Sequence, residues 1–312
     1  MFSRRSFLQK AASILALTAL PFPAASFAAS APVSSTRMLM GTFVAIHISG
    51  TTESHANEAM EQAFLEMGRL ETLLTRHDAS SPLSLLNKGG QLRDCPKELI
   101  HVAQAASRLH QRSNGAFDPT VLPLLEARQN KTDSRIQREA SALIGMERVS
   151  MSAKELRFQQ TGMKMSLDGI AKGHIADAGA ATLARLGIQN FLIDAGGDIV
   201  ARGSKSGKPW KVAVQDPTGN GAYPAVCALS GGAIATSGSY ENGQHIIDPA
   251  GKTAMSAISA TVIAPTAMEA DALATALCVM PDPIAFIDSM PGTACLIIRP
   301  DGSRASSRLW QA

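Results

Sequence analysis

The first clear pattern along the chain is an alternation of apolar and polar residues over Thr42–Ser49. Val44, Ile46 and Ile48 fall on one face, which predicts a half-buried strand. The next segment carries apolar residues at spacings of four and three, which is typical of an amphipathic helix. Its apolar positions are Ala56, Met60, Ala63, Met67, Leu70 and Leu74. Polar and glycine-containing residues from 80 to 90 are expected to end this helix.

The middle of the chain is less regular. A second helix is predicted over residues 96–112, with Asn114-Gly115 as its stop signal. Residues 129–139 form the most polar segment, which indicates an exposed loop or a helix edge. Two strand-like runs within 148–167 surround Thr161-Gly162 and predict a hairpin that turns at this pair.

The second half of the chain mixes helices and strands without a regular βαβ rhythm. A helix is predicted over 171–185, and a strand over 191–193 runs into Ala195-Gly196-Gly197. Further strands are expected at 210–214, 225–229, 257–263 and 294–298. The last helix, over 266–280, should lie between the final two strands. This pattern favours an α+β fold with a mixed, largely antiparallel sheet, in one compact unit or two tightly joined lobes.

Residues 1–28 have the layout of a twin-arginine signal peptide. Arg4-Arg5 precede Phe7-Leu8 and an apolar run over 11–20, and small residues before position 29 fit a cleavage site. The alternative is a membrane anchor, but the apolar stretch is short for a bilayer and is interrupted by prolines. We therefore expect a mature domain over 29–312, exported to the periplasm and either free or membrane-associated there.

The charge and cysteine composition of the chain limits which kinds of binding partner and metal site are expected. The signal contains three of the 29 basic residues and no acid, which leaves 26 basic and 26 acidic residues in the mature chain. A nucleic-acid-binding protein usually has a basic excess or stripe, so nucleic acid is not an expected partner. The four cysteines lack C-x-x-C spacing, which argues against a zinc or thioredoxin-like site and leaves a disulfide open.

The most specific local feature is the stretch that begins at Pro265 and continues through Thr275. Thr266 and Glu269 fit a capping box, which sets the helix start. Asp271 and Thr275 are four residues apart and therefore share one helix face. A carboxylate and a hydroxyl are hard oxygen ligands suited to Mg²⁺. The alternative is a threonine bonded back to its own helix and an exposed aspartate.

Three more segments are candidates for ligand contacts. In the run from Leu167 to His174, Lys172 lies between glycines at a helix entry, where amides and an ammonium can meet a phosphate. The segment from Asp194 to Asp198 can be a plain hairpin turn or a close approach to a ligand. His245, before an Asp-Pro turn, is a candidate general base, although an isolated histidine is more often structural.

Taken in order, the motifs of this chain closely resemble the ApbE family of FAD:protein FMN transferases. The resemblance covers about residues 40–280. It rests on M-G-T at Met40, S-x-L-S-x-L-N ending at Asn87, G-A-F-D-P-T from Gly115, G-I-A-K-G, D-A-G-G-D, A-T-S-G-S-Y, H-I-I-D-P and the A-D-A-L-A-T helix. It implies a T-fold-like ApbE architecture and a Mg²⁺-dependent reaction in which a Thr or Ser hydroxyl of a target protein takes FMN from FAD and AMP is released.

The resemblance also implies roles for individual residues. Asp271 and Thr275 match the side-chain metal ligands of the family, and Gly169 matches the position that supplies a main-chain carbonyl. The residues matching FAD-contact positions are Met40, Asp168, Lys172, His245 and Ile247, with His245 as the expected base. The expected partners are FAD and an acceptor protein with a Thr or Ser site, such as a periplasmic or membrane redox subunit.

Some positions depart from the family pattern. Ser166 stands where many relatives have aspartate, and Asp168 can substitute from a shifted place. The usual Trp-Gly pair is replaced near Glu126-Ala-Arg128, and the stretch from Asp248 lacks an Arg-Thr pair. Two alternatives to protein flavinylation follow. One is an FAD pyrophosphatase that forms FMN and AMP, and the other is a non-catalytic flavin-binding protein.

Overall fold

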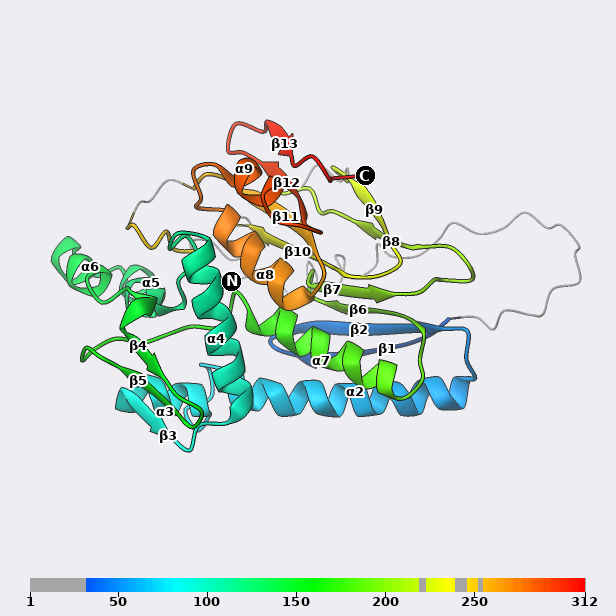
Figure 1. Cartoon of the computed structure of the whole chain (residues 1–312), viewed down its shortest axis with the longest axis horizontal. Helices are drawn as coiled ribbons and strands as arrows, with labels where there is room; N and C mark the ends of the chain where they lie inside the picture. Colours follow the sequence, from blue (N-terminus) through cyan, green and yellow to red (C-terminus); the bar gives the residue numbers. More distant parts are fainter. Residues whose placement is uncertain (1–31, 219–222, 239–245, 252–254, 312) are drawn as a thin grey trace, which may run out of the picture.

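The computed structural model describes residues 32–218, 223–238, 246–251 and 255–311. Its centre is an eight-stranded sheet with the order β1-β2-β6-β7-β10-β11-β12-β13, in which every neighbouring pair is antiparallel (Figure 1). These strands are β1 (Val33–Leu39), β2 (Thr42–Ser49), β6 (Asn190–Ala195), β7 (Ile199–Arg202), β10 (Ala233–Gly238), β11 (Ser259–Ala264), β12 (Ala294–Ile298) and β13 (Arg304–Ser306).

Helices and two small sheets complete the described chain. The helices are α2 (Glu53–Leu74), α3 (Pro82–Gly89), α4 (Lys97–Arg112), η1 (Pro119–Val121), α5 (Leu122–Gln129), α6 (Ser134–Ser141), η2 (Met146–Arg148), α7 (Ala171–Arg185), α8 (Ala267–Leu277) and α9 (Pro283–Asp288). One small sheet pairs β3 (Gln91–Arg93), β5 (Glu155–Phe158) and β4 (Val149–Met151), and the other pairs β8 (Trp210–Ala213) with β9 (Val226–Leu229).

The large sheet is covered differently on its two faces. Helices α2, α7 and α8 pack on one face, where the alternating residues Val44, Ile46 and Ile48 of β2 are fully or almost fully buried. The β8–β9 pair covers part of the other face, with Trp210 buried against Leu192 and neighbouring strands. Figure 1 shows α2, α7 and α8 as a layer beside the strands. Apolar burial on both faces is the main stabilising contribution.

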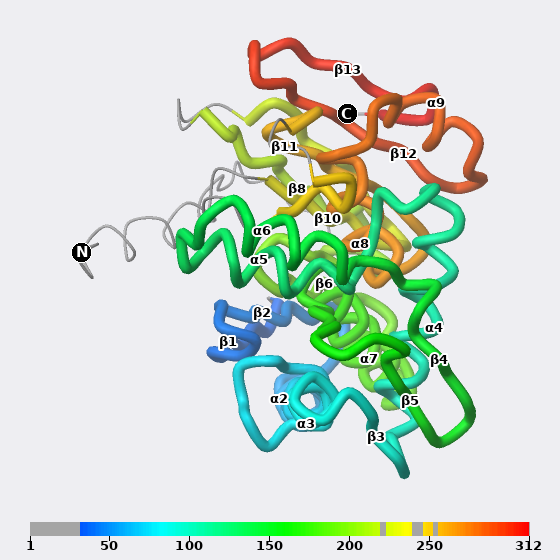
Figure 2. The backbone as a smooth tube through the Cα atoms, turned by 90° about the vertical axis from the view of Figure 1, so that its left-hand side faces the viewer, coloured from blue at the N-terminus to red at the C-terminus, as the bar shows by residue number. Residues whose placement is uncertain are grey.

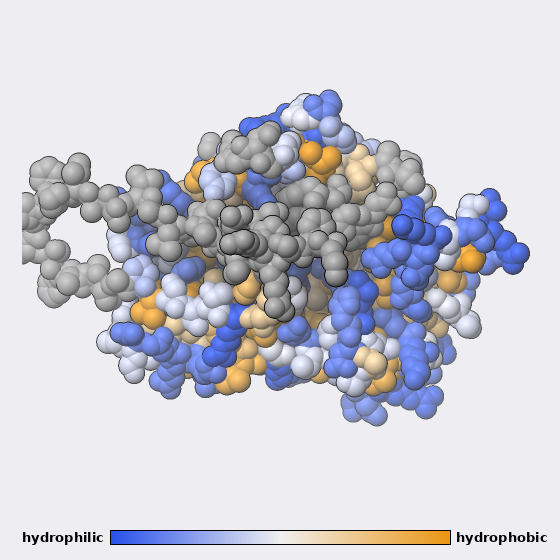
Figure 3. All heavy atoms as spheres, turned by 180° about the vertical axis from the view of Figure 1, so that it is seen from behind, coloured by the Kyte–Doolittle hydropathy of each residue, from blue (hydrophilic) through white to orange (hydrophobic). Residues whose placement is uncertain are grey.

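The segment between α2 and α7 builds the end of the molecule that carries α3 to α6 (Figure 2). It is not a separate unit, because the buried residues of α3, α4 and β5 belong to the same continuous core as those of the central layers, while the buried residues of α5 and α6 form a small cluster of their own. Leu99 of α4 and Leu156 of β5 are fully buried in this core. Seen from behind, the tip of this end is mostly hydrophilic (Figure 3), in keeping with the polar sequence of α6.

Most of the predicted elements are confirmed, including the α+β class with its antiparallel sheet. The helices expected over 96–112 and 171–185 correspond to α4 and α7, and the strand over Thr42–Ser49 is β2. The helix expected over 266–280 is shorter, and it is not the last one, because α9 follows it. Strands β1, β7 and β10 were not predicted as separate elements.

Two local predictions are wrong. The break expected over 80–90 contains helix α3, because the Ser81 hydroxyl accepts a hydrogen bond from the Ser84 amide and Pro82 opens the first turn. The hairpin does not turn at Thr161-Gly162. Its strands β4 and β5 are joined by residues 152–154, and Thr161-Gly162 lies beyond β5. The polar segment 129–139 leads into helix α6, which Asp133 caps.

Two further observations concern the helices and the cysteines. Across the described residues, every helix falls short of the length and apolar character that membrane crossing requires. All four cysteines are buried free thiols, and burial raises the pKa of Cys95 and Cys295 to about 11. These thiols are therefore packing residues without nucleophilic activation. The proposed signal peptide and its cleavage site lie outside the described residues.

Candidate active site

The start of helix α8 is fixed by two oxygen groups. The Thr266 hydroxyl accepts a hydrogen bond from the Glu269 amide at 3.2 Å, as the capping motif predicts. The carboxylate of Asp177, on α7, accepts hydrogen bonds from the amides of Ala267 and Met268 at 2.9 Å each. The first turn of α8 is therefore satisfied by a side chain from the neighbouring helix. No local signal in the sequence predicts this second cap.

Helices α7 and α8 approach each other closely because a glycine lies at their contact. A Cβ atom added to Gly173 would lie 2.2 Å from the carbonyl oxygen of Ala267. Any side chain at this position would force the two helix starts apart. The close approach also lets the Gly173 amide donate a hydrogen bond to the carboxylate of Asp271 at 3.1 Å.

Asp271 and Thr275 project from α8 toward the turn before α7, as expected. Asp271 is only 2% exposed, and the Thr275 hydroxyl lies 3.2 Å from the Ser237 hydroxyl on β10. A Cβ atom on Gly169 would lie 2.8 Å from Thr275 Oγ1, so the Gly169 backbone directly faces that hydroxyl. The structure therefore brings together all three predicted metal-ligand residues. It also argues against the alternative of an exposed aspartate.

A second buried carboxylate lies beside this group. Asp198, which is 1% exposed, follows the turn between β6 and β7 and forms an ion pair with the ammonium of Lys172. Burial and the negative charge of Asp198 raise the pKa of Asp271 well above its usual range, against the opposing charge of Lys172. Asp198 stands in the D-A-G-G-D motif, where no local signal distinguishes it from its neighbours.

This electrostatic arrangement suits a cation. Two buried carboxylates face a single lysine, so ionisation of Asp271 is costly unless another positive charge is present. The Asp271 carboxylate and the Thr275 hydroxyl are hard oxygen donors, which is the ligand type that Mg²⁺ selects. The residues present therefore fit a magnesium ion, with Asp271, Thr275 and the backbone of Gly169 to hold it.

Met40 lies in the two-residue turn between β1 and β2, at a positive φ of 54°. Its amide donates a hydrogen bond to Glu71 Oε1 at 2.8 Å, which holds the strained turn against α2. A Cβ atom on Gly196 would lie 2.5 Å from Thr42 Oγ1, so this turn adjoins the turn that leads to Asp198. A strained non-glycine residue at this edge of the sheet is consistent with a ligand contact.

Asp168 lies at the rim of the site. Its side chain is half exposed, and its Oδ2 atom accepts a hydrogen bond from Arg76 Nε at 2.7 Å. The Ser166 hydroxyl accepts a hydrogen bond from the Asp168 amide at 3.1 Å, so the serine that departs from the family pattern supports the turn before α7. The charge of Asp168 contributes to the raised pKa of Asp271, which places it near the site.

The remaining predicted residues follow β10. His245 lies outside the described residues, and Ile247 is buried in a small apolar cluster with α5. Arg128 donates a hydrogen bond to the carbonyl of Gly251 at 3.1 Å, and Asp248 accepts one from the Ala250 amide. Arg128, which stands in the stretch that lacks Trp-Gly, therefore holds the segment after His245.

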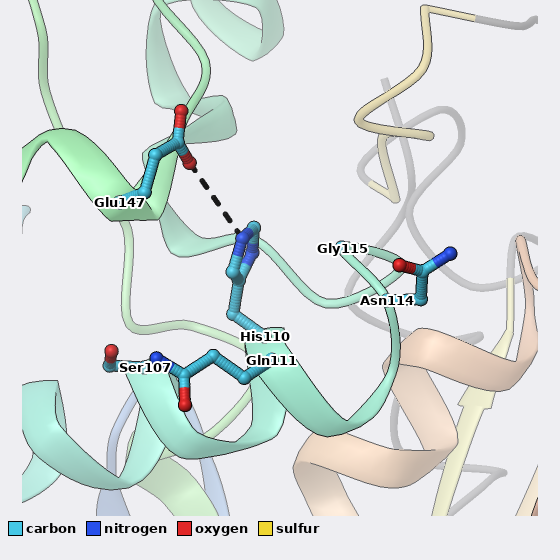
Figure 4. A pocket seen from close by; sticks show the side chains of 6 residues that line it. All are labelled: Ser107, His110, Gln111, Asn114, Gly115 and Glu147. Atoms are coloured by element: carbon cyan, nitrogen blue, oxygen red, sulfur yellow. Dashed lines mark ion pairs between the residues drawn. The ribbon is translucent and has the colours of Figure 1, made fainter.

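A separate cluster of possible metal ligands joins His110, Asp118 and Glu147. Two of them, His110 and Glu147, line a surface pocket (Figure 4). The Nδ1 atom of His110 lies 3.1 Å from the Phe117 carbonyl and 3.2 Å from Asp118 Oδ2. Asp118 also accepts hydrogen bonds from the amides of Thr120 and Met146. The hydrogen bond to Asp118 raises the pKa of His110, which favours a protonated, structural histidine over a metal ligand.

Comparisons with known proteins agree with the geometry. The family model described as the ApbE family matches residues 40–297. A Klebsiella pneumoniae protein named FAD:protein FMN transferase is 30% identical over 77% of this chain and 76% of its own length. An Escherichia coli K12 protein of the same name is 28% identical over 100% of this chain and 95% of its own length.

Solved structures show the same architecture. The crystal structure of the ApbE protein from Thermotoga maritima superposes with a TM-score of 0.79 at 28% identity, over 89% of this chain and 97% of the other. The Pseudomonas stutzeri flavinyl transferase ApbE in its apo form gives the same TM-score at 23% identity, which supports the fold alone. The ApbE architecture expected from the sequence is confirmed.

Proposed function

This chain belongs to the ApbE family, and on that premise we propose that it is an FAD:protein FMN transferase that depends on Mg²⁺. The observation that carries the proposal is the buried Asp271 carboxylate beside Thr275, Gly169 and the Lys172–Asp198 pair. The relatives named above share the transferase activity in their names. The metal dependence is supported by the fit of the oxygen donors to a hard cation.

Each described residue has a defined task in this reaction. When bound, Mg²⁺ supplies positive charge that stabilises the charge developing on the phosphates. Lys172 contributes a second positive charge and is held in place by Asp198. Met40, in the turn between β1 and β2, and Asp168, in the turn before α7, are proposed to contact the flavin nucleotide. Ile247 packs against α5 and thereby anchors the segment that carries His245.

The transfer breaks the phosphoanhydride bond of FAD and forms a phosphoester. The hydroxyl oxygen of a Thr or Ser on the acceptor forms a bond to the FMN-side phosphorus of FAD, and the bond from that phosphorus to the AMP oxygen breaks. AMP leaves with the electron pair, and the hydroxyl proton passes to a base. We assign that base to His245. If water replaces the protein hydroxyl, the same site produces FMN and AMP, which is the pyrophosphatase reaction.

The test is the identity of the products. The mature protein is incubated with FAD, Mg²⁺ and washed membranes or periplasmic extract from the source cells, and AMP and flavin fluorescence on a denaturing gel are measured. AMP with a fluorescent acceptor band supports the transferase. AMP with free FMN and no band would replace it by the pyrophosphatase, and FAD binding without AMP would leave a non-catalytic flavin-binding protein.

We also propose that the protein works in the periplasm after export by the twin-arginine route, on a periplasmic or membrane redox subunit. The paired Arg4-Arg5 supports this, because the export receptor distinguishes arginine from lysine. Replacing both by lysine is expected to retain the precursor in the cytoplasm, measured by cell fractionation. Undiminished export of the double-lysine precursor would show that another route is used.

A further inference from the structure

Two histidines from different helices face each other on the surface formed by α4 and α7. The rings of His101 and His174 have centroids 5.4 Å apart and an interplanar angle of 42°. His101 is exposed and His174 is half-buried. Neither residue belongs to the candidate active site described above.

We propose that His101 and His174 form a binding site for a divalent transition-metal ion such as Zn²⁺, Ni²⁺ or Cu²⁺, with the Glu98 carboxylate as a third ligand. Two imidazoles that bind one tetrahedral ion at ordinary metal–nitrogen distances place their ring centroids about 5 Å apart. The observed separation matches this requirement.

The sequence of α4 supports this assignment. Glu98 and His101 are separated by three positions, so they lie on the same face of the helix. This Glu-x-x-His spacing is the arrangement by which helix bundles present a carboxylate and an imidazole to one metal centre. The Glu98 side chain is 19% exposed and therefore lies largely within the protein surface.

Carboxylates and basic side chains both surround the pair. Glu66, on α2, and Glu98 act electrostatically on His174. Arg69 forms ion pairs with both carboxylates, at 2.8 Å to Glu66 and 3.0 Å to Glu98. Arg185 also acts on Glu66 and Lys97 on Glu98, so these carboxylates are compensated and the two imidazoles are the principal ligands of the ion.

The protonation state of His174 is also suitable. Burial, together with the adjacent His101, lowers the pKa of His174 to about 4. The ring is therefore neutral near pH 7, which is the form that binds metals. His110 differs in this respect, because the hydrogen bond to Asp118 raises its pKa. Imidazole ligands select transition metals over Mg²⁺, so this site is chemically distinct from the oxygen-lined site at Asp271.

The test measures Zn²⁺ binding by isothermal titration calorimetry on the mature protein, in excess Mg²⁺ so that oxygen sites do not contribute. We expect one equivalent of Zn²⁺ to bind, with affinity reduced at least about tenfold in His101→Ala and in His174→Ala. Glu98→Gln should weaken binding less. His77→Ala, which changes a different exposed histidine, is the matched control and should retain wild-type affinity.

A second measurement keeps the proposal testable if a variant folds poorly. Cu²⁺ bound to the wild-type protein should show two nitrogen ligands in its electron paramagnetic resonance spectrum, and one in His101→Ala, whose exposed position should tolerate the change. The proposal is overturned if His101→Ala and His174→Ala both bind Zn²⁺ like wild type. It is also overturned if His110→Ala abolishes binding, because the ion would then lie at the His110 pocket.

Discussion

Gly173→Ala tests whether the contact between α7 and α8 creates the active site. The new Cβ would lie 2.2 Å from the carbonyl oxygen of Ala267 and 2.7 Å from the Met268 amide nitrogen, and both neighbours are backbone atoms that cannot rotate away. The two helix starts must therefore separate by roughly 1 Å to reach an ordinary contact distance. Such overpacking typically costs about 1–3 kcal/mol.

Two effects oppose each other in this variant. Alanine in a helix is favoured over glycine by about 0.5–1 kcal/mol, so the expected net loss of unfolding free energy is about 1–2 kcal/mol. The effect on activity should be larger. A shift of this size moves the Gly173 amide away from Asp271, and a 1 Å misplacement of a reacting group can reduce the rate about 100-fold.

The measurements are urea unfolding followed by circular dichroism and Mg²⁺-dependent AMP release from FAD. Gly89→Ala is the matched control, because Gly89 is also helical but a Cβ atom there would meet open space. This control should be at least as stable as wild type and fully active. If Gly173→Ala matches Gly89→Ala in both measurements, the close helix contact is not what assembles the site.

Three other outcomes are expected. Asp271→Ala should abolish Mg²⁺-dependent AMP release, and Thr275→Val should weaken it less, because the carboxylate carries the charge that holds the cation. A double-digit percentage of wild-type activity in Asp271→Ala at limiting Mg²⁺ would refute the metal assignment. His245→Ala should keep FAD affinity and lose turnover by roughly 10²–10⁴-fold, and loss of FAD binding with normal turnover at saturating FAD would make it a binding residue. The pKa of His110 is raised in the folded protein, so protonated His110 stabilises the fold. This stabilisation is fully present below pH 6.5, the ordinary pKa of histidine, and is lost as the pH rises through the folded-state pKa. The unfolding free energies of wild type and His110→Gln should therefore converge with rising pH, and a gap that does not depend on pH would contradict this.

The parts of the structure that the sequence predicts well are those with a strong periodic signal. Helix α2 has a buried residue at nearly every third or fourth position, and its pattern alone identifies it. Strand β10 has the sequence AIATSG, which consists of small residues without a strong alternation, and it forms because β7 and β11 supply its hydrogen bonds on both sides. A pattern within one segment does not record such pairing.

The same limit applies to the candidate site. Asp271 and Thr275 are found from their spacing on one helix, because both signals are local. Asp177 and Asp198 cannot be found in this way, because their roles depend on which distant backbone group or side chain they contact. Asp177 caps a helix 90 residues further along the chain, and only the packing of α7 on α8 shows this.

The separation along the chain of the groups that form the site has a consequence for how the protein matures. The Gly173 amide and the Asp271 carboxylate are 98 residues apart, so the proposed cation site does not exist until α8 has been synthesised. Contacts over such long loops form late in folding. A nascent or truncated chain that lacks α8 would expose the face of α7 that packs on it and would lack Asp271 and Thr275. With the cation bound as proposed, metal binding would report completed folding, and a cation-dependent increase in stability would distinguish folded molecules from partly folded ones.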